Sequence, residues 1–368
     1  MRGLLSLMLA IPLVVGCGDA AKDDDDDDWT DEDSADGGWG STGGESGGGS
    51  STGDTDGGSS TGDTDGADDG GSDDGGSDDG GTDDGGTDDT GTGTESAASD
   101  PRFDEFINVV DLPSGDFSCF TGSLQIEEAA TGCVAQRSLL GSVRDFQEDS
   151  PVGEATVEFF WDNTLTSAPD EVLTSDGDGN LLVEADTCSA FSYRVTTDPA
   201  VGATKTTIDT HDVLPHMGPV NPISHLLSSV SSTTYTLIPA LLGEVPDPSK
   251  GMVTGLAYDC EIHRIEGLQV VVDDGFGNIP DGVMAKYFVD EFPNRAQAHT
   301  SDDGLWMLLD VPVGDWVVSG YVADGAGGHI LVGKAPISVV ADSINISSVY
   351  TGIEDGIKMP SQCLSSCG

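Results

Sequence analysis

Asp176, Asp178 and Asn180 have the one-three-five spacing that opens an EF-hand calcium loop. That loop also needs glycine at position six and a bidentate glutamate at position twelve. This chain has Leu181 and Thr187 at those positions. We therefore predict an aspartate-rich hairpin turn here, and no calcium site.

A second segment, GHILVGK at residues 328–334, has the two glycines and the lysine of a phosphate-binding P-loop at the right spacing. Ala335 stands where that loop has a serine or threonine for magnesium. The residues between the two glycines are bulky and typical of strands, and an exported protein meets no ATP pool. We interpret the match as a coincidence.

Three histidines, His211, His216 and His225, lie within fifteen residues of one another, and imidazoles from one loop could ligate a metal. The prolines among them favour an extended surface connection with solvated histidines. The chain also lacks the HExxH and G-x-S-x-G motifs of metal-dependent and serine hydrolases. We therefore predict no catalytic residue, no metal site and no cofactor, and hence a protein that is not an enzyme.

The chain has seven cysteines, and Cys17 stands apart from the others at the end of the N-terminal apolar run. The other six are Cys119, Cys133, Cys188, Cys260, Cys363 and Cys367. An even set in an exported chain predicts disulfides, and no C-x₂-C spacing favours zinc. We expect Cys119 to pair with Cys133. Cys260 is expected to pair with Cys363 or Cys367.

The N-terminus has the features of a signal peptide. Arg2 gives it a positive start, and the apolar run LLSLMLAIPLVV follows. That run is shorter than the roughly 20 residues of a membrane-spanning helix. The sequence VVGC, ending at Cys17, resembles the bacterial lipobox. The resemblance implies that Cys17 becomes an acylated, palmitate-bearing mature N-terminus that anchors the chain in a membrane.

The alternative is an ordinary signal peptide with a chance cysteine, but its cleavage site would need an A-x-A-like pattern of small residues. Valines stand before Gly16 and Cys17 instead. The next residue is Gly18 and not an aspartate, which by resemblance to known sorting signals favours the outer membrane and the cell surface of a Gram-negative bacterium.

The charge balance of the chain is strongly acidic. Thirteen Lys and Arg residues stand against 67 Asp and Glu residues, and the net charge is −54. Phosphate backbones would be repelled by this charge, so we exclude nucleic acid as a partner. Residues 18–100 hold 28 of the acidic residues, and Lys22 is their single base.

Residues 18–100 consist largely of Asp, Gly, Ser and Thr, with near-repeats such as GGSDDGGSDD. A segment of this composition cannot bury enough apolar surface to offset the entropy of ordering, so we predict a disordered tether. A calcium-binding β-helix is the alternative for Asp-Gly repeats. That structure needs a recurrent aliphatic residue, and the segment has none.

Beyond residue 100 the pattern changes to alternating β-branched and aromatic stretches between turn residues, which predicts an all-β fold. The expected strands are 155–161, 191–197, 268–272, 285–289, 314–322 and 344–350. One helix is expected from Ser231 to Gly243, short or kinked at Pro239. We predict a first β-sandwich with an N-terminal hairpin at 101–230, a partly helical connector at 231–250, a second β-sandwich at 251–358 and a Cys-containing tail at 359–368.

Two stretches share a plan. In the first, GSVRDF begins at Gly141 and TSDGDGNLLV at Thr174. In the second, TGLAYDC begins at Thr254, and TSDDGLWMLLDVPVGDWVVSGY at Thr300. This plan resembles the carboxypeptidase-regulatory-like, transthyretin-like domains. The second copy lacks that family's proline near Gly267, and the first copy lacks its final Pro-x-Gly-aromatic element.

The resemblance implies tandem Ig-like or transthyretin-like sandwiches of seven strands each, used as structural, spacing or binding modules, with no shared catalytic residues to carry over. Together with the anchor and the tether, it favours a non-enzymatic surface lipoprotein whose ligand is a protein or a glycan. One alternative is an adhesin or carbohydrate-binding module that uses exposed aromatics such as Trp161, Trp306 or Tyr287. A second alternative is a hydrolase or an enzyme accessory protein.

Overall fold

The computed structural model describes residues 100, 102–198, 200 and 204–367. The predicted signal peptide, Cys17 and all of the predicted tether except Asp100 lie outside these residues. Within the described residues, none of the helices combines the length and the apolar character that a membrane span requires.

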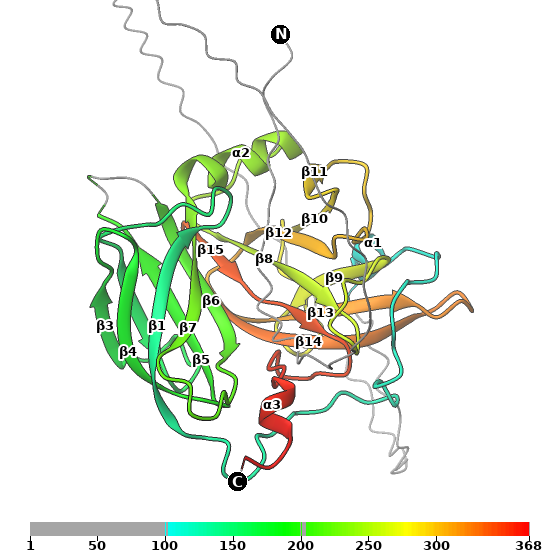
Figure 1. The fold of residues 1–368 in the computed structure, drawn as a ribbon. Helices are drawn as coiled ribbons and strands as arrows, with labels where there is room; N and C mark the ends of the chain where they lie inside the picture. The colour runs from blue at the N-terminus through cyan, green and yellow to red at the C-terminus, as the bar shows by residue number, and fades with distance from the viewer. Residues whose placement is uncertain (1–99, 101, 199, 201–203, 368) are drawn as a thin grey trace, which may run out of the picture. The chain divides into compact units, whose positions relative to one another are not determined.

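The strands of residues 136–231 form the first sandwich, drawn in green in Figure 1. They are β1 (Gln136–Asp145), β2 (Thr156–Phe160), β3 (Glu171–Thr174), β4 (Asn180–Asp186), β5 (Ala190–Thr196), β6 (Thr204–Val213) and β7 (Ile223–Ser231). In one sheet β1 pairs antiparallel with β4 and parallel with β7. In the other sheet the order is β3-β2-β5-β6.

Alternation along the strands explains this packing. In β4, Leu181, Val183 and Ala185 are buried, while the residues between them are exposed. Successive side chains of a strand point to opposite faces, so β4 presents one apolar face to the core. The core between the two sheets includes Leu139, Val157, Phe159, Phe191, Tyr193 and Leu227.

The second sandwich follows in yellow to red. Its strands are β8 (Gly251–Tyr258), β9 (Leu268–Asp273), β10 (Met284–Val289), β11 (Phe292–Asn294), β12 (Leu305–Val311), β13 (Gly314–Ala323), β14 (His329–Val339), β15 (Ser343–Ile346) and β16 (Val349–Tyr350). A separate three-stranded sheet has the order β14-β13-β9. Trp306 lies fully buried between the sheets, with Val253, Val270 and Leu308 in the same core.

One short strand joins the two sandwiches. β15 pairs in parallel with β6 of the first sandwich and with β8 of the second. A continuous path of hydrogen-bonded strands therefore runs β11-β10-β12-β8-β15-β6-β5-β2-β3. The predicted all-β fold with two sandwiches is confirmed, and the two sandwiches share a sheet.

The chain crosses β8 at very close range just after β15. A Cβ atom placed on Gly255 would lie 1.6 Å from the carbonyl oxygen of Ser347. The backbone amide of Ser347 donates to the Thr254 carbonyl oxygen over 2.9 Å, which holds the crossing together. Only glycine leaves room for this contact.

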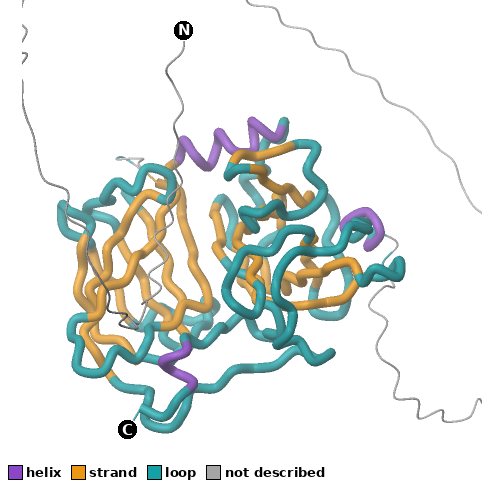
Figure 2. Tube along the Cα trace, turned by 45° about the vertical axis from the view of Figure 1, so that its right-hand side comes forward, coloured by secondary structure: helices purple, strands orange, loops and turns teal. Residues whose placement is uncertain are grey.

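The helix α2 (Ser232–Leu242) matches the helix predicted from Ser231 to Gly243. The Ser231 hydroxyl accepts from the Thr234 amide over 3.1 Å, and Gly243 ends the helix in the left-handed conformation. Figure 2 shows α2 across the top of the two groups of strands. The remaining helices of the described residues are single turns, α1 (Phe103–Phe106) and α3 (Ser361–Leu364).

The segment before β1 differs from the N-terminal hairpin that we predicted on the first sandwich. This segment follows the second sandwich instead, through a β-bridge between Ser114 and Glu266. Nearby, the Gln269 side chain accepts from the amides of Asn108 and Val109 over 2.8 and 3.0 Å. Gln269 is 3% exposed, so these hydrogen bonds tie the N-terminal segment to a buried side chain of the second sandwich.

Candidate functional site

All six cysteines of the described residues form disulfides, but not the expected ones. The bonds are Cys119–Cys260, Cys133–Cys367 and Cys188–Cys363. Both expected pairings are therefore wrong. The physical reason is the course of the two chain ends, because the N-terminal segment follows the second sandwich while α3 returns to the first.

The predicted aspartate-rich turn is present, but it closes no hairpin, because β3 pairs with β2 while β4 pairs with β1 in the other sheet. One carboxylate oxygen of Asp176 accepts from the amides of Asp178 and Asn180 over 2.9 and 2.8 Å, and Gly179 has a positive φ. The P-loop-like segment lies mostly in strand β14, so it is no phosphate-binding loop. The described residues contain no group of three or more His, Cys, Asp or Glu side chains arranged to hold a metal ion.

The three histidines do not share the extended loop that we predicted. His211 lies on β6 and His225 on β7, and His216 alone occupies the connection between the two strands. Each imidazole has its own partner: Asn163 at 2.8 Å for His211, the Cys133 carbonyl oxygen at 3.1 Å for His216 and Asp212 at 3.3 Å for His225. Burial lowers the pKa of His211.

Asp209 on β6 is a partly buried titratable group in the same region. Its carboxyl group accepts a hydrogen bond of 3.0 Å from the Tyr193 hydroxyl, which in turn accepts from the Ser228 amide over 2.7 Å. Burial and the neighbouring Asp212 carboxylate raise the pKa of Asp209 well above its ordinary value. Sequence reasoning missed this pair, because Asp209 and Tyr193 come from two different strands.

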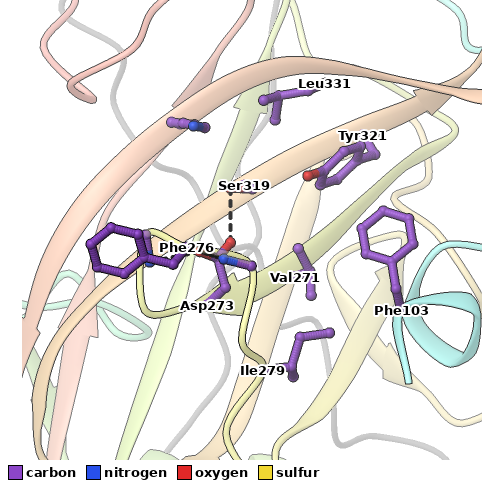
Figure 3. A pocket seen from close by; sticks show the side chains of 11 residues that line it. Phe103, Val271, Asp273, Phe276, Ile279, Ser319, Tyr321 and Leu331 are labelled. Atoms are coloured by element: carbon purple, nitrogen blue, oxygen red, sulfur yellow. Dashed lines mark hydrogen bonds between the residues drawn. The ribbon is translucent and has the colours of Figure 1, made fainter. Parts of the chain in front are cut away.

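A pocket of about 360 Å³ opens on the outer face of the three-stranded sheet, and Figure 3 shows it at close range. Cross-strand register explains which residues reach it. Ser319 on β13 lies opposite Val271 on β9 and opposite Lys334 on β14, so their side chains share one face. The pocket is lined by Phe103, Val271, Asp273, Gly275, Phe276, Gly277, Ile279, Ser319, Tyr321, Leu331 and Lys334.

The base of this pocket is polar. Asp273 is 8% exposed, and its Oδ1 atom accepts from the Gly275 and Gly277 amides over 2.7 and 3.3 Å. Its Oδ2 atom has only a long contact of 3.5 Å with the hydroxyl of Ser319, drawn as the dashed line in Figure 3. Among the described residues, neither Asp273 nor Lys334 has an ion-pair partner.

Aromatic and aliphatic side chains form part of the wall of the same pocket. The rings of Phe103 and Tyr321 meet edge to face, with centroids 5.2 Å apart. Figure 3 shows the Tyr321 hydroxyl pointing to the centre of the pocket, between Leu331 and Val271. Burial, together with the charge of Asp273, raises the pKa of Tyr321 to about 12, so this hydroxyl stays a hydrogen-bond donor at neutral pH.

A second cavity, of about 460 Å³, lies under α2 against the outer face of β8 and β12. Its lining is mostly apolar, and the helix contributes Leu237 and Leu241, which are 44% and 49% exposed. Phe292 on β11 is 42% exposed at the same cavity. Few polar groups line this cavity, so little in it could fix the orientation of a ligand.

The aromatic residues proposed to contact a glycan divide into two groups. Trp306 and Tyr287 are 0% and 3% exposed and belong to the core of the second sandwich, so neither can stack on a sugar. Trp161 is partly exposed and stacks on Phe159 at 4.9 Å between ring centroids. It lines a small pocket with Gln136, Glu171, Glu184, Asp186, Ser189 and Phe191.

No protein-family model matches the chain. No curated protein matches it either.

This chain has a low structural similarity to three solved structures. The Bacillus anthracis TIE protein is 10% identical with a TM-score of 0.20, and the match covers 59% of this chain and 34% of that one. The shaft pilin of Lactobacillus rhamnosus GG is 9% identical with a TM-score of 0.20, over 59% and 98% of the two chains. BcpA, the major pilin subunit of Bacillus cereus, is 7% identical with a TM-score of 0.20, over 59% and 100%. These similarities are too low to assign a ligand or an activity.

Proposed function

We propose that the chain is a membrane-anchored lipoprotein at the cell surface, whose joined β-sandwiches have a binding role and no catalytic one. The observation that carries this proposal is the cysteine pattern. Six cysteines form three disulfides among themselves, and the seventh, Cys17, follows a signal-like apolar run. Disulfides persist in oxidising compartments, so the pattern supports export.

The anchor can be tested by metabolic labelling with a palmitate analogue in a Gram-negative host. We expect label on the wild-type chain and none on the Cys17→Ser variant. The acyl groups are attached to the sulfur of Cys17 and to its α-amino group, and serine has no sulfur. The Cys363→Ser variant is the matched control and should keep the label. Release of an unlabelled wild-type protein into the medium would contradict the anchor.

The binding role is supported by the pocket on the β9-β13-β14 face. A pocket with apolar walls and a few convergent polar groups is the usual form of a small-molecule site. The resemblance to transthyretin-like domains also supports a binding role, because domains of that family act as binding and spacing modules.

A glycan ligand is the second candidate, and the position of Trp161 favours it. A partly exposed indole beside three carboxylates and the Gln136 amide could stack on a sugar ring while the polar groups bind its hydroxyls. Glycan-array binding by the full chain that is lost in Trp161→Ala would support this candidate. Binding that survives this substitution would exclude the Trp161 pocket as the glycan site.

A further inference from the structure

Two opposite charges face the pocket of Figure 3 without neutralising each other. Asp273 lies on β9 and Lys334 on β14, with Ser319 of the strand between them. All three line the pocket, yet the two charged groups are beyond ion-pair distance. A buried carboxylate is costly unless it is paired or hydrogen-bonded, and only Oδ1 of Asp273 has short hydrogen bonds.

We propose that this pocket binds a small zwitterion, an α-amino acid with an apolar side chain. The ligand ammonium group donates to Oδ2 of Asp273, and the ligand carboxylate lies at the Lys334 ammonium group. This inference rests on the proposed binding role and specifies its ligand class.

The remaining pocket residues complete the match to such a ligand. The Tyr321 hydroxyl has no hydrogen-bond partner among the described residues and points into the pocket, so it can donate to the ligand carboxylate. Val271, Ile279 and Leu331 give an apolar wall for the ligand side chain. The Phe276 side chain is 88% exposed on the loop that Asp273 holds, at the rim of the pocket.

Charge also argues for a zwitterion over a simple anion. The chain carries a net charge of −54, so an anionic ligand would be repelled before it reached Lys334. A simple cation could meet Asp273 but would leave Lys334 unpaired. A zwitterion is neutral overall and satisfies both groups with charge-assisted hydrogen bonds.

Calorimetry on the full chain in detergent tests the proposal with L-leucine as the probe. Two analogues each remove one charge: 3-methylbutylamine lacks the carboxylate and 4-methylpentanoate lacks the ammonium group. We expect leucine to bind and each analogue to bind about tenfold more weakly or worse, because each loses charge-assisted hydrogen bonds. Equal binding of the amine would overturn the role of Lys334, and the absence of leucine binding at millimolar concentration would overturn the proposal.

Two substitutions locate the site. Asp273→Asn keeps an oxygen for the Gly275 and Gly277 amides, so the loop should persist while leucine binding falls about tenfold or more. Lys334→Met keeps the length of the side chain and should weaken leucine binding to a similar degree. Lys250 does not line the pocket, so the Lys250→Met variant should bind leucine as wild type does. Labelling of Cys17 is measured separately, so failure of leucine binding leaves the anchor proposal standing.

Discussion

Cys188 and Cys363 are bonded across 175 residues of sequence, and this bond holds the C-terminal turn α3 against the first sandwich. Cys363 is fully buried beside Met359 and Cys133. Met359, Cys363 and Cys367 therefore belong to a core that also contains Cys133 and Cys188.

Removal of that bond should destabilise the protein. For Cys188→Ala with Cys363→Ala we expect a loss of about 2–5 kcal/mol of unfolding free energy, because a long loop is released in the unfolded chain. Thermal unfolding followed by circular dichroism measures the change. A melting temperature equal to that of wild type would show that the bond adds nothing to stability.

Gly255 should not tolerate a side chain. Gly255→Ala places a Cβ on the Ser347 carbonyl oxygen, so we expect a loss of at least about 2 kcal/mol or a failure to fold. Gly177 is the matched control, because a Cβ there meets nothing within 4 Å. Urea unfolding of the two variants compares them, and equal stability would contradict the close crossing.

The core tryptophan allows a prediction about its polar atom. Trp306 is 0% exposed, and its indole N–H has no hydrogen-bond partner among the described residues. Trp306→Ala should therefore cost about 3–5 kcal/mol, mainly through the cavity that it leaves. Trp306→Phe should cost clearly less, because phenylalanine leaves a smaller cavity and the indole N–H makes no hydrogen bond that could be lost. A larger cost for phenylalanine than for alanine in urea unfolding would disprove this packing.

Asp209 should make stability depend on pH. Its pKa is raised in the folded protein, so folding favours the protonated form. Its stabilising contribution is full below the ordinary pKa of 3.8 and is lost as pH rises through the raised value. Asp209→Asn cannot lose a proton, so we expect its melting temperature relative to wild type to increase from pH 4 to pH 8. A difference that does not change with pH would contradict the shift.

Local patterns predicted the regular elements well. Alternation located β2, β5, β9, β10 and β13, and α2 lies within the helix expected from Ser231 to Gly243. These features depend on neighbours in sequence, so one chain is enough to show them. The pairing of β15 with β6 and β8 depends on contacts about 90 to 140 residues apart, which a local pattern does not record.

For the same reason, the sequence alone did not indicate most of the candidate site. Asp273, Ser319 and Lys334 come from three strands, and only the register of β13 with its neighbours brings them to one pocket. In the sequence, Lys334 stands out only as part of a chance match to a P-loop. The expected disulfide pairings were wrong for a related reason. Six cysteines allow 15 pairings, and the routes of the two chain ends decide which pairing forms.

The bond between Cys119 and Cys260 has a mechanical consequence. A pulling force that enters from the N-terminal side reaches Cys119 before any strand of the first sandwich, and the bond passes it to the end of β8. Residues 120–259, which include the whole first sandwich, lie within this covalent loop and are shielded from extension. Tension between the N-terminal side and the second sandwich would thus pass through this disulfide and bypass the first sandwich, which would stay folded.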